Sequence, residues 1–377
     1  MTTTASAGVL EHTGAARGRI ALVVGTRPES IKMAPIADEL GEDAVIIHTG
    51  QHNSPGMIQP QSRQRTVTLP HQPHTTRGAQ LGRTIAALDT LFTAARPDVV
   101  AVQGDTTSAV AGALAANAAG IPLLHVEAGL RSFDRRMPEE HNRILIDHIA
   151  DLCCAPTTLA VEHLRGEGLP EHRIVLTGNP VVEAAIRALP APGEQDRILR
   201  EAGLRDNGYV LATIHRPENV DDSTTLGAIL RALAESPLPV LLPVHPRLRA
   251  HLGPHLPALQ RAPVRLTGPL GYPQLLALAR RARLIVTDSG GLQEEATVLK
   301  TPIIVVRRSN ERPEIEGVFG CRVAPGALLP TLKEWTNEQR HGVDLCSIPS
   351  PYGDGTASAR IAREARRLQT SALPARG

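Results

Sequence analysis

The sequence is poor in aromatic residues and in net charge. Phe, Trp and Tyr make up 2% of its 377 residues, which argues against the stacking rings that single-stranded nucleic acid requires. Its 40 Lys and Arg side chains nearly cancel its 38 Asp and Glu side chains, leaving a net charge of +2. No broad field therefore draws the chain to nucleic acid or to a membrane surface. We expect any anion to be bound by a local cluster of charges.

Long apolar runs and metal-binding spacings are also lacking. No stretch approaches the roughly 20 apolar residues of a membrane-spanning helix. Residues 1–17 lack the basic and apolar regions of a secretion signal, and we interpret them as a disordered tail on a cytoplasmic protein. The four cysteines show no CxxC or Cys/His spacing, so we predict reduced thiols and no metal site. They are Cys153, Cys154, Cys321 and Cys346.

What the chain does contain is an alternation of short apolar runs with helical patterns. Its length exceeds the roughly 250 to 300 residues at which single cores stop growing, so we expect two domains. Near-continuous apolar runs are typical of strands buried on both faces of a parallel sheet. The first series is 19–26, 44–50, 98–105, 122–128 and 173–179; the second is 208–215, 238–245, 262–268, 282–290 and 301–308. The pattern predicts the α/β class, with two Rossmann-like, doubly wound domains facing across a cleft.

Ligands of doubly wound sheets bind beyond the carboxyl ends of the strands. The segment VVGTRPES (23–30) places Arg27 at such a strand end, with Lys32 one turn further on. Backbone N–H groups and the positive end of a helix favour a phosphate there, and the two cations would add charge. An ordinary strand-to-helix turn is the alternative.

A second turn of this kind occurs in TDSGGLQEEA. Asp288 or Ser289 is a candidate helix cap, and Gly290 and Gly291 would let backbone approach a diphosphate without interference from a side chain. Glu294 or Glu295 could accept hydrogen bonds from two neighbouring ribose hydroxyls, because a carboxylate has two acceptor oxygens. A plain capped helix is the alternative here.

Carboxylates follow two strands of the first series. Asp105 and Glu127 each end an apolar run, and Glu139 and Glu140 open the helix PEEHNRILIDHIA. Acids in the first turn of a helix often serve only its dipole, which is our interpretation of Glu140. Asp105 and Glu127 are expected at the mouth of the site.

Histidines end two strands of the second series. His215 is followed by Arg216, and His245 lies in PVHPR. A histidine at a strand end can donate to a phosphate or move a proton near neutral pH. A structural histidine with satisfied hydrogen bonds is the alternative in both cases.

Ten segments, in this order over roughly residues 18 to 325, resemble the non-hydrolysing UDP-N-acetylglucosamine 2-epimerases. They are GTRPE, TGQH, QGDTTS, HVEAGLR, PEEHNR, TGNPVVEA, TIHRPENVD, PVHPR, TDSGGLQEEA and NERPE. The Pro/Gly-bearing link near 188–196 predicts a boundary between a first domain at 18–188, after the tail at 1–17, and a second at 189–355. The resemblance implies a GT-B-like fold in which the second domain binds UDP and the helix at 356–370 rejoins the first. It also implies a homodimer that acts on a UDP-sugar without a cofactor.

The resemblance implies inversion at C2 by anti elimination of UDP and its re-addition to a 2-acetamidoglucal intermediate. It assigns roles to individual residues by motif. Asp105, Glu127 and Glu139 would be the acid and base, and His215 would stabilise departing UDP. The implied substrate-binding residues are Arg27, Lys32, Arg143, Arg216, His245, Ser289, Gly290, Gly291, Glu295 and Arg312.

Two other activities remain possible on the same motifs. A hydrolysing 2-epimerase would release N-acetylmannosamine and UDP, and a GT-B glycosyltransferase would share the phosphate cradle. The segment 53–78 departs from the family pattern, which places in question the regulatory UDP-sugar site of bacterial members.

Overall fold

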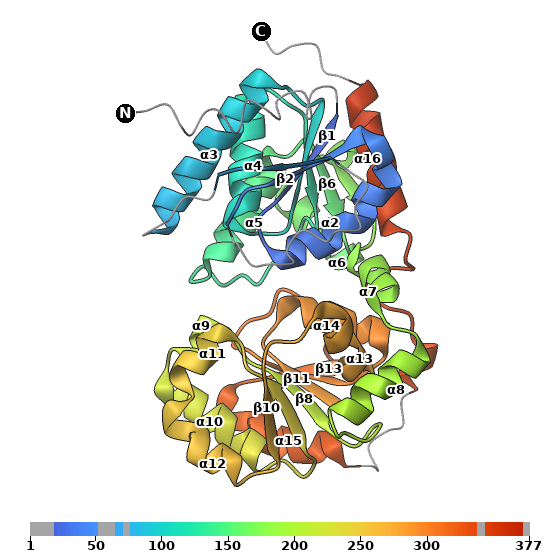
Figure 1. Ribbon diagram of the computed structural model, residues 1–377. Helices are drawn as coiled ribbons and strands as arrows, with labels where there is room; N and C mark the ends of the chain where they lie inside the picture. The colour runs from blue at the N-terminus through green and yellow to red at the C-terminus, as the bar shows by residue number, and fades with distance from the viewer. Residues whose placement is uncertain (1–18, 52–64, 71–75, 338–343, 372–377) are drawn as a thin grey trace. The chain divides into compact units, whose positions relative to one another are not determined.

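The computed structural model describes residues 19–51, 65–70, 76–337 and 344–371 (Figure 1). The predicted tail and most of segment 53–78 lie outside these ranges. The chain divides into two compact units. Unit 1 comprises Met1–Ala184 and Tyr352–Gly377, and unit 2 comprises Ala185–Pro351.

Unit 1 is built on a parallel sheet of seven described strands in the order β3-β2-β1-β4-β5-β6-β7. Their bounds are β1 (Ile20–Val24), β2 (Ala44–His48), β3 (Arg65–Thr68), β4 (Val99–Gln103), β5 (Leu123–Val126), β6 (Leu152–Ala155) and β7 (Ile174–Leu176). The strand order reverses direction between β1 and β4, which pair in parallel with Ile20 opposite Val99. This reversal is the topological switch point, where ligands of such sheets bind.

Both faces of this sheet are buried. The helices of unit 1 are α2 (Arg27–Leu40), α3 (Arg77–Ala94), α4 (Thr107–Ala118), α5 (Pro138–Ile149), α6 (Thr158–Gly166), the linking α7 (Val181–Ala188) and α16 (Ala357–Thr370). Along β1, Ala21 and Val23 belong to the core that α3 and α4 cover. Ile20 and Leu22 belong to the core that α2 and α16 cover. Strands buried on both faces explain the near-continuous apolar runs.

Helix α16 packs on unit 1 although it follows unit 2 in the chain (Figure 1). Its Ile361 and Ala365 are buried in the core that includes Met33 of α2. The backbone N–H of Ser358, at the start of α16, donates to the Glu183 carboxylate at 2.6 Å. The expected return of the C-terminal helix to the first domain is confirmed.

Unit 2 repeats the architecture with six described strands in the order β10-β9-β8-β11-β12-β13. They are β8 (Val210–Thr213), β9 (Val240–Pro243), β10 (Val264–Thr267), β11 (Leu284–Thr287), β12 (Ile303–Val306) and β13 (Gly320–Val323). Its helices are α8 (Pro192–Glu201), α9 (Pro217–Val220), α10 (Ser223–Ala234), α11 (Pro246–His251), α12 (Leu256–Gln260), α13 (Tyr272–Arg280), α14 (Gly290–Leu299) and α15 (Leu328–Thr336). The switch point lies between β8 and β11, so the predicted α/β class with two Rossmann-like, doubly wound domains is confirmed.

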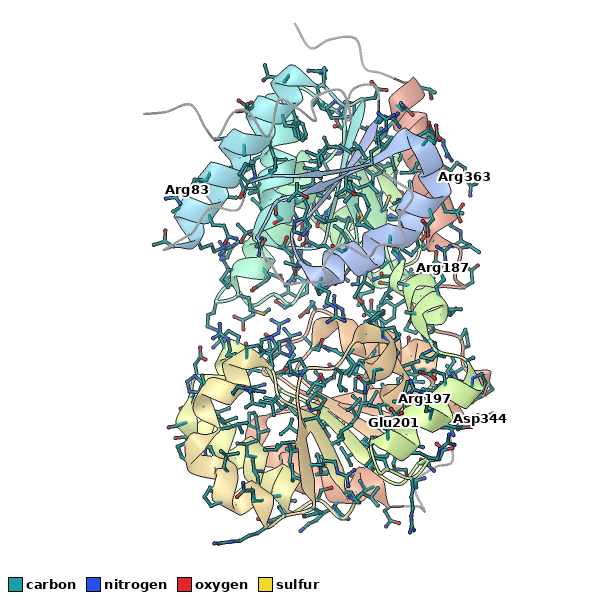
Figure 2. The ribbon with its side chains drawn as sticks, viewed as in Figure 1. Arg83, Arg187, Arg197, Glu201, Asp344 and Arg363 are labelled. Carbon is teal, nitrogen blue, oxygen red and sulfur yellow. The ribbon has the colours of Figure 1, made fainter. Side chains whose placement is uncertain are left out.

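Helix α8 has one buried apolar face and one exposed charged face. Ile198 and Leu199 are buried, whereas Arg197 is exposed and pairs with Glu194 and Glu201 at 2.5 Å on its own helix (Figure 2). Such exposed pairs contribute little to stability, so burial of the apolar face holds the helix. Within the described ranges, no helix is both long and apolar enough to cross a bilayer.

Candidate active site

The β1–α2 turn, residues 25 and 26, is closed by a glutamate from the helix that follows it. Glu29 accepts from the N–H groups of Gly25 at 3.1 Å and Thr26 at 2.7 Å, forming a capping box with Thr26. These two amides were predicted to bind a phosphate, and Glu29 occupies them instead. Arg27, the first helical residue, is exposed. An anion at this turn would therefore meet the Arg27 side chain.

Gly25 is required by crowding at the end of β1. A Cβ atom at this position would lie 1.9 Å from Ser108 Oγ and 2.5 Å from Thr49 Oγ1. Ser108 in turn donates to the Gln51 side chain at 2.6 Å. The motifs GTRPE, TGQH and QGDTTS thus meet at the carboxyl ends of β1, β2 and β4.

Lys32 and Glu127 form a buried ion pair. Lys32 Nζ lies 2.6 Å from Glu127 Oε2, and the two side chains are 6% and 3% exposed. Gln103, the last residue of β4, also donates to this oxygen. Glu127 has a φ of 69°, a left-handed conformation that costs free energy outside glycine and often occurs at functional sites. Lys32, predicted to contact substrate, contacts Glu127 in this structure.

Asp105 and Arg143 form a second ion pair of unit 1. Arg143, on α5, is buried and contacts both the Asp105 carboxylate and Glu140. The Asn142 side chain donates to the Asp105 carbonyl at 2.6 Å. Arg143 therefore links the end of β4 to α5. Arg143 was predicted to contact substrate, and in this structure it contacts Asp105 and Glu140.

The two glutamates at the start of α5 have different environments. Glu140 is buried and accepts from the N–H groups of Ser132 and Phe133 at 2.9 and 2.8 Å. Burial would raise its pKa, but these bonds and Arg143 lower it below the ordinary value. The interpretation of Glu140 as only a dipole partner is wrong. Glu139 is half-buried, and its side chain makes no hydrogen bond or ion pair with any described residue.

A buried network lies behind Glu127 and was missed from the sequence. His125 contacts Asp147 through Nδ1 at 2.6 Å and donates through Nε2 to the Gly104 carbonyl at 2.9 Å. Arg131 contacts Asp147 at 2.7 Å and Glu167 at 2.6 Å. Burial would raise the pKa of Asp147, but His125 and Arg131 lower it. This network holds the strand end that presents Asp105 and the loop after Glu127.

In unit 2, a buried aspartate organises the switch point. Asp288 follows β11, is 0% exposed, and accepts from the N–H groups of His215 at 3.0 Å and Arg216 at 2.9 Å. The Asn219 side chain donates to it at 3.1 Å. Burial would raise the pKa of Asp288, but His215 and these donors lower it. Ser289, not Asp288, caps α14.

The His215 ring is oriented by Asp288. Its Nδ1 lies 3.0 Å from Asp288 Oδ1, and its side chain is 36% exposed. This contact places a proton on Nδ1 and leaves Nε2 for another partner. His245 lies beside it, with ring centroids 5.4 Å apart. His245 Nδ1 accepts from the Arg247 N–H at 3.2 Å and so caps α11.

Helix α14 begins at the other side of this switch point. A Cβ atom on Gly290 would lie 2.7 Å from an Arg312 nitrogen, whereas Gly291 faces open space. Arg312 is buried and donates to Glu294 at 2.7 Å. Glu295 accepts from the Tyr272 hydroxyl at 2.8 Å. Glu294 is thus engaged by an arginine, which favours Glu295 as the candidate ribose ligand.

Buried acids and arginines continue behind α14. Glu311 contacts both Arg312 and Arg307, the latter at 2.8 Å, and lies 3.7 Å from Arg216. The predicted residues of unit 2 therefore gather at the ends of β8 and β11, where the structure adds Glu311. Among the described side chains, no group of three or more His, Cys, Asp or Glu could hold a metal ion.

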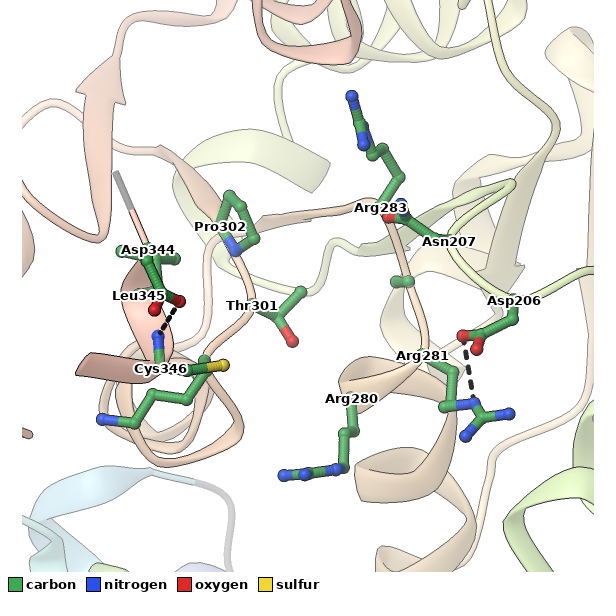
Figure 3. Close-up of a pocket in the computed structure, with 12 residues that line it drawn as sticks. Asp206, Asn207, Arg280, Arg281, Arg283, Thr301, Pro302, Asp344, Leu345 and Cys346 are labelled. Atoms are coloured by element: carbon green, nitrogen blue, oxygen red, sulfur yellow. Dashed lines mark hydrogen bonds and ion pairs between the residues drawn. The ribbon is translucent and has the colours of Figure 1, made fainter. Parts of the chain in front are cut away.

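A cavity of about 290 Å³ lies at the opposite ends of the unit 2 strands. Its lining includes Arg283 and Pro302, which directly precede β11 and β12 (Figure 3). Arg281 contacts Asp206 there at 3.0 Å. None of the predicted site residues lines this cavity, so we do not assign it to the candidate active site.

The fold and these strand-end residues define an α/β enzyme of the GT-B type with two Rossmann-like units. Comparisons with known proteins identify its family. Residues 37–365 match the family model described as UDP-N-acetylglucosamine 2-epimerase. The UDP-N-acetylglucosamine 2-epimerase of Methanocaldococcus jannaschii is 36% identical over 367 residues, covering 92% of this chain and 98% of that protein.

Two further matches show the range of the relatives. The crystal structure of the M. jannaschii enzyme in complex with UDP-GlcNAc and UDP has a TM-score of 0.81 at 34% identity, covering 93% of this chain and 99% of that one. The UDP-2,3-diacetamido-2,3-dideoxy-D-glucuronate 2-epimerase of Pseudomonas aeruginosa is 34% identical over 367 residues, covering 93% of this chain and 100% of that protein. The chain belongs to the UDP-N-acetylglucosamine 2-epimerase family, and it is an epimerase.

Proposed function

We propose that the enzyme interconverts UDP-N-acetylglucosamine and UDP-N-acetylmannosamine. UDP would leave C1 in an anti elimination, giving 2-acetamidoglucal, and would then add back to give the opposite configuration at C2. The observation that carries the proposal is the pair of acidic strand ends at neighbouring strands of unit 1, Asp105 after β4 and Glu127 after β5. The named activity of the M. jannaschii relative supports it.

The chemistry requires carboxylates and leaving-group stabilisation together. The proton at C2 is not acidic, since no carbonyl adjoins that carbon, so positive character must develop at C1 as UDP departs. A nearby carboxylate can then take the C2 proton. Asp105, Glu127 and Glu139 are the proposed acid and base groups, and Glu139 has a carboxylate without a partner among the described residues.

Unit 2 is proposed to hold the nucleotide. Donors aimed at a leaving diphosphate stabilise the charge that develops there. The capped start of α14 offers Ser289, Gly290 and Gly291, and His215 has Nε2 available beside it. Glu295 is the proposed ribose ligand. The remaining predicted contacts are Arg27, Lys32, Arg143, Arg216, His245 and Arg312.

Deuterium incorporation tests the proposed reaction. UDP-N-acetylglucosamine is incubated with the enzyme in D₂O without an acceptor, and proton NMR follows C2 and the products. We expect deuterium at C2 of both UDP-sugars. Free N-acetylmannosamine formed in step with UDP would establish the hydrolysing reaction, and recovered substrate without deuterium would indicate a glycosyltransferase or a binding protein.

The sugar itself needs a parallel arm, because one relative is named for a diacetamido-glucuronate. The same assay with that UDP-sugar gives a ratio of kcat/KM values. A ratio that favours the glucuronate would replace the proposed substrate and keep the reaction. We also propose a homodimer, from the resemblance alone, and a cytoplasmic location. Light scattering after gel filtration and cell fractionation would check them.

A further inference from the structure

Glu29 connects two turns that present proposed site residues. One oxygen of its carboxyl accepts from the Gly25 and Thr26 amides of the β1–α2 turn. The other accepts from the Thr106 hydroxyl at 2.6 Å, and Thr106 belongs to the β4–α4 turn, residues 104–106. β1 and β4 are the neighbouring strands of the switch point. The Glu29 carboxyl thus bridges the two sides of the switch point.

Each end of this bridge lies next to a proposed site residue. Thr26 directly precedes Arg27, and Thr106 directly follows Asp105. Thr106 also caps α4 by accepting from the Ala109 N–H at 3.0 Å. The bridge therefore fixes the start of α4 and the residue before it. A shift of this turn would move Asp105 relative to Arg27.

Helix capping alone does not account for this arrangement. A capping-box glutamate needs only the cap N–H of its own helix, and that bond forms readily at the surface. Glu29 is 1% exposed, and among the described residues its carboxyl contacts only neutral groups of residues 25, 26 and 106. Burying a carboxyl without a cation costs free energy. Beyond the capping of its own helix, the buried Glu29 carboxyl makes one further contact, the hydrogen bond from Thr106 across the switch point.

We propose that Glu29 is a positioning residue for the reaction, which sets Asp105 relative to Arg27 by bridging the β1–α2 and β4–α4 turns. The inference rests on the proposed function, since it concerns the placement of the proposed acid or base. Displacing a reacting group by about 1 Å costs roughly a hundredfold in rate. Loss of the bridge should therefore lower kcat with little effect on the binding of UDP, which is assigned to unit 2.

The test compares three variants with the wild type. Glu29→Ala removes the bridge, and we expect kcat for epimerisation to fall by about tenfold to a hundredfold, with the Kd for UDP within about threefold. Glu29→Gln keeps an acceptor for the two amides and a polar group for Thr106, and we expect kcat within about threefold of wild type. Glu42→Gln, an exposed glutamate just beyond the same helix, makes the same chemical change and should leave kcat unchanged.

Thr106→Val cuts the bridge from its other end and keeps the test valid if Glu29→Ala does not fold. We expect the same loss of kcat with UDP binding retained. Loss of kcat of threefold or less in both of these variants overturns the inference, as does a Glu29→Gln variant as impaired as Glu29→Ala. A wild-type enzyme that places no deuterium at C2 overturns the proposed function, and the inference with it.

Discussion

Replacing Glu29 by Gln should change how the stability of unit 1 depends on pH. The pKa of Glu29 is raised from 4.5 to about 7, because burial outweighs the hydrogen bonds from Thr106, Thr26 and Gly25. The charged residues nearest to Glu29 and to Thr106 in the sequence include Arg27, Lys32 and Asp105. None of these three forms an ion pair with Glu29. The native state therefore holds this proton more tightly than the unfolded chain.

The sign and size of the effect follow from linkage. Since the folded pKa is raised, the contribution of Glu29 to stability is fully present below about pH 4.5 and is lost as pH rises through about 7. The rise corresponds to about 3 kcal/mol, at about 1.4 kcal/mol per pH unit. Gln cannot ionise; its carbonyl can accept from the two amides, and its amide can donate to the Thr106 hydroxyl. The variant should exceed the wild type by less than about 1 kcal/mol near pH 5 and by about 3 kcal/mol near pH 9.

Urea unfolding followed by far-UV circular dichroism, at each pH from 5 to 9, measures this difference. Hydrogen exchange of β1 and β4 amides assigns it to unit 1. Glu42→Gln is the control, because Glu42 is exposed and its loss should give a curve parallel to wild type. A Glu29→Gln difference that stays constant within about 0.5 kcal/mol over this pH range would refute the reasoning.

Three further substitutions test individual contacts. Lys32→Met leaves Glu127 buried without its cation and should destabilise the protein by about 3 to 5 kcal/mol in urea unfolding. Asp288→Asn should lower stability by about 3 kcal/mol at pH 7. The stability difference between wild type and Asp288→Asn should shrink in thermal unfolding as the pH falls below about 3.8. The pKa of Asp288 is lowered in the folded state, so its contribution is lost as the pH falls toward that folded pKa. Ile361→Ala should cost about 2 to 5 kcal/mol by leaving a cavity under α16, measured by thermal unfolding.

Most of the fold could be predicted because its strands are buried on both faces. The ten apolar runs each contain a strand, but β3, β6 and β13 were missed. β3, with sequence RTVT, is an edge strand with two exposed residues, so it lacks an apolar run. β6, with sequence LCCA, contains no β-branched or aromatic residue, and β13, GCRV, contains one. Short or mixed strands depend on their neighbours in the sheet, which a local pattern does not contain.

The site could be predicted by position but not by partner. Strand ends are visible in the sequence, so the positions of Asp105, Glu127 and His215 just after strands could be predicted. Their partners come from distant segments: Lys32 precedes Glu127 by 95 residues. The pairing therefore depends on the tertiary fold. Glu29 was missed although its capping-box spacing from Thr26 was readable.

Helix α16 has a consequence for the order in which the protein can mature on the ribosome. Unit 2 is one continuous stretch, Ala185–Pro351, whereas one face of the unit 1 sheet is covered by α2 together with α16, which follows Tyr352 in the chain. Unit 2 can thus complete its fold during translation, while unit 1 emerges first and its core on this face lacks the α16 residues Ile361 and Ala365 until the end of the chain is made. A premature stop before Ala357 would spare the whole of the later unit and leave the earlier one unfinished. The unit that is synthesised first is therefore the last to complete its core.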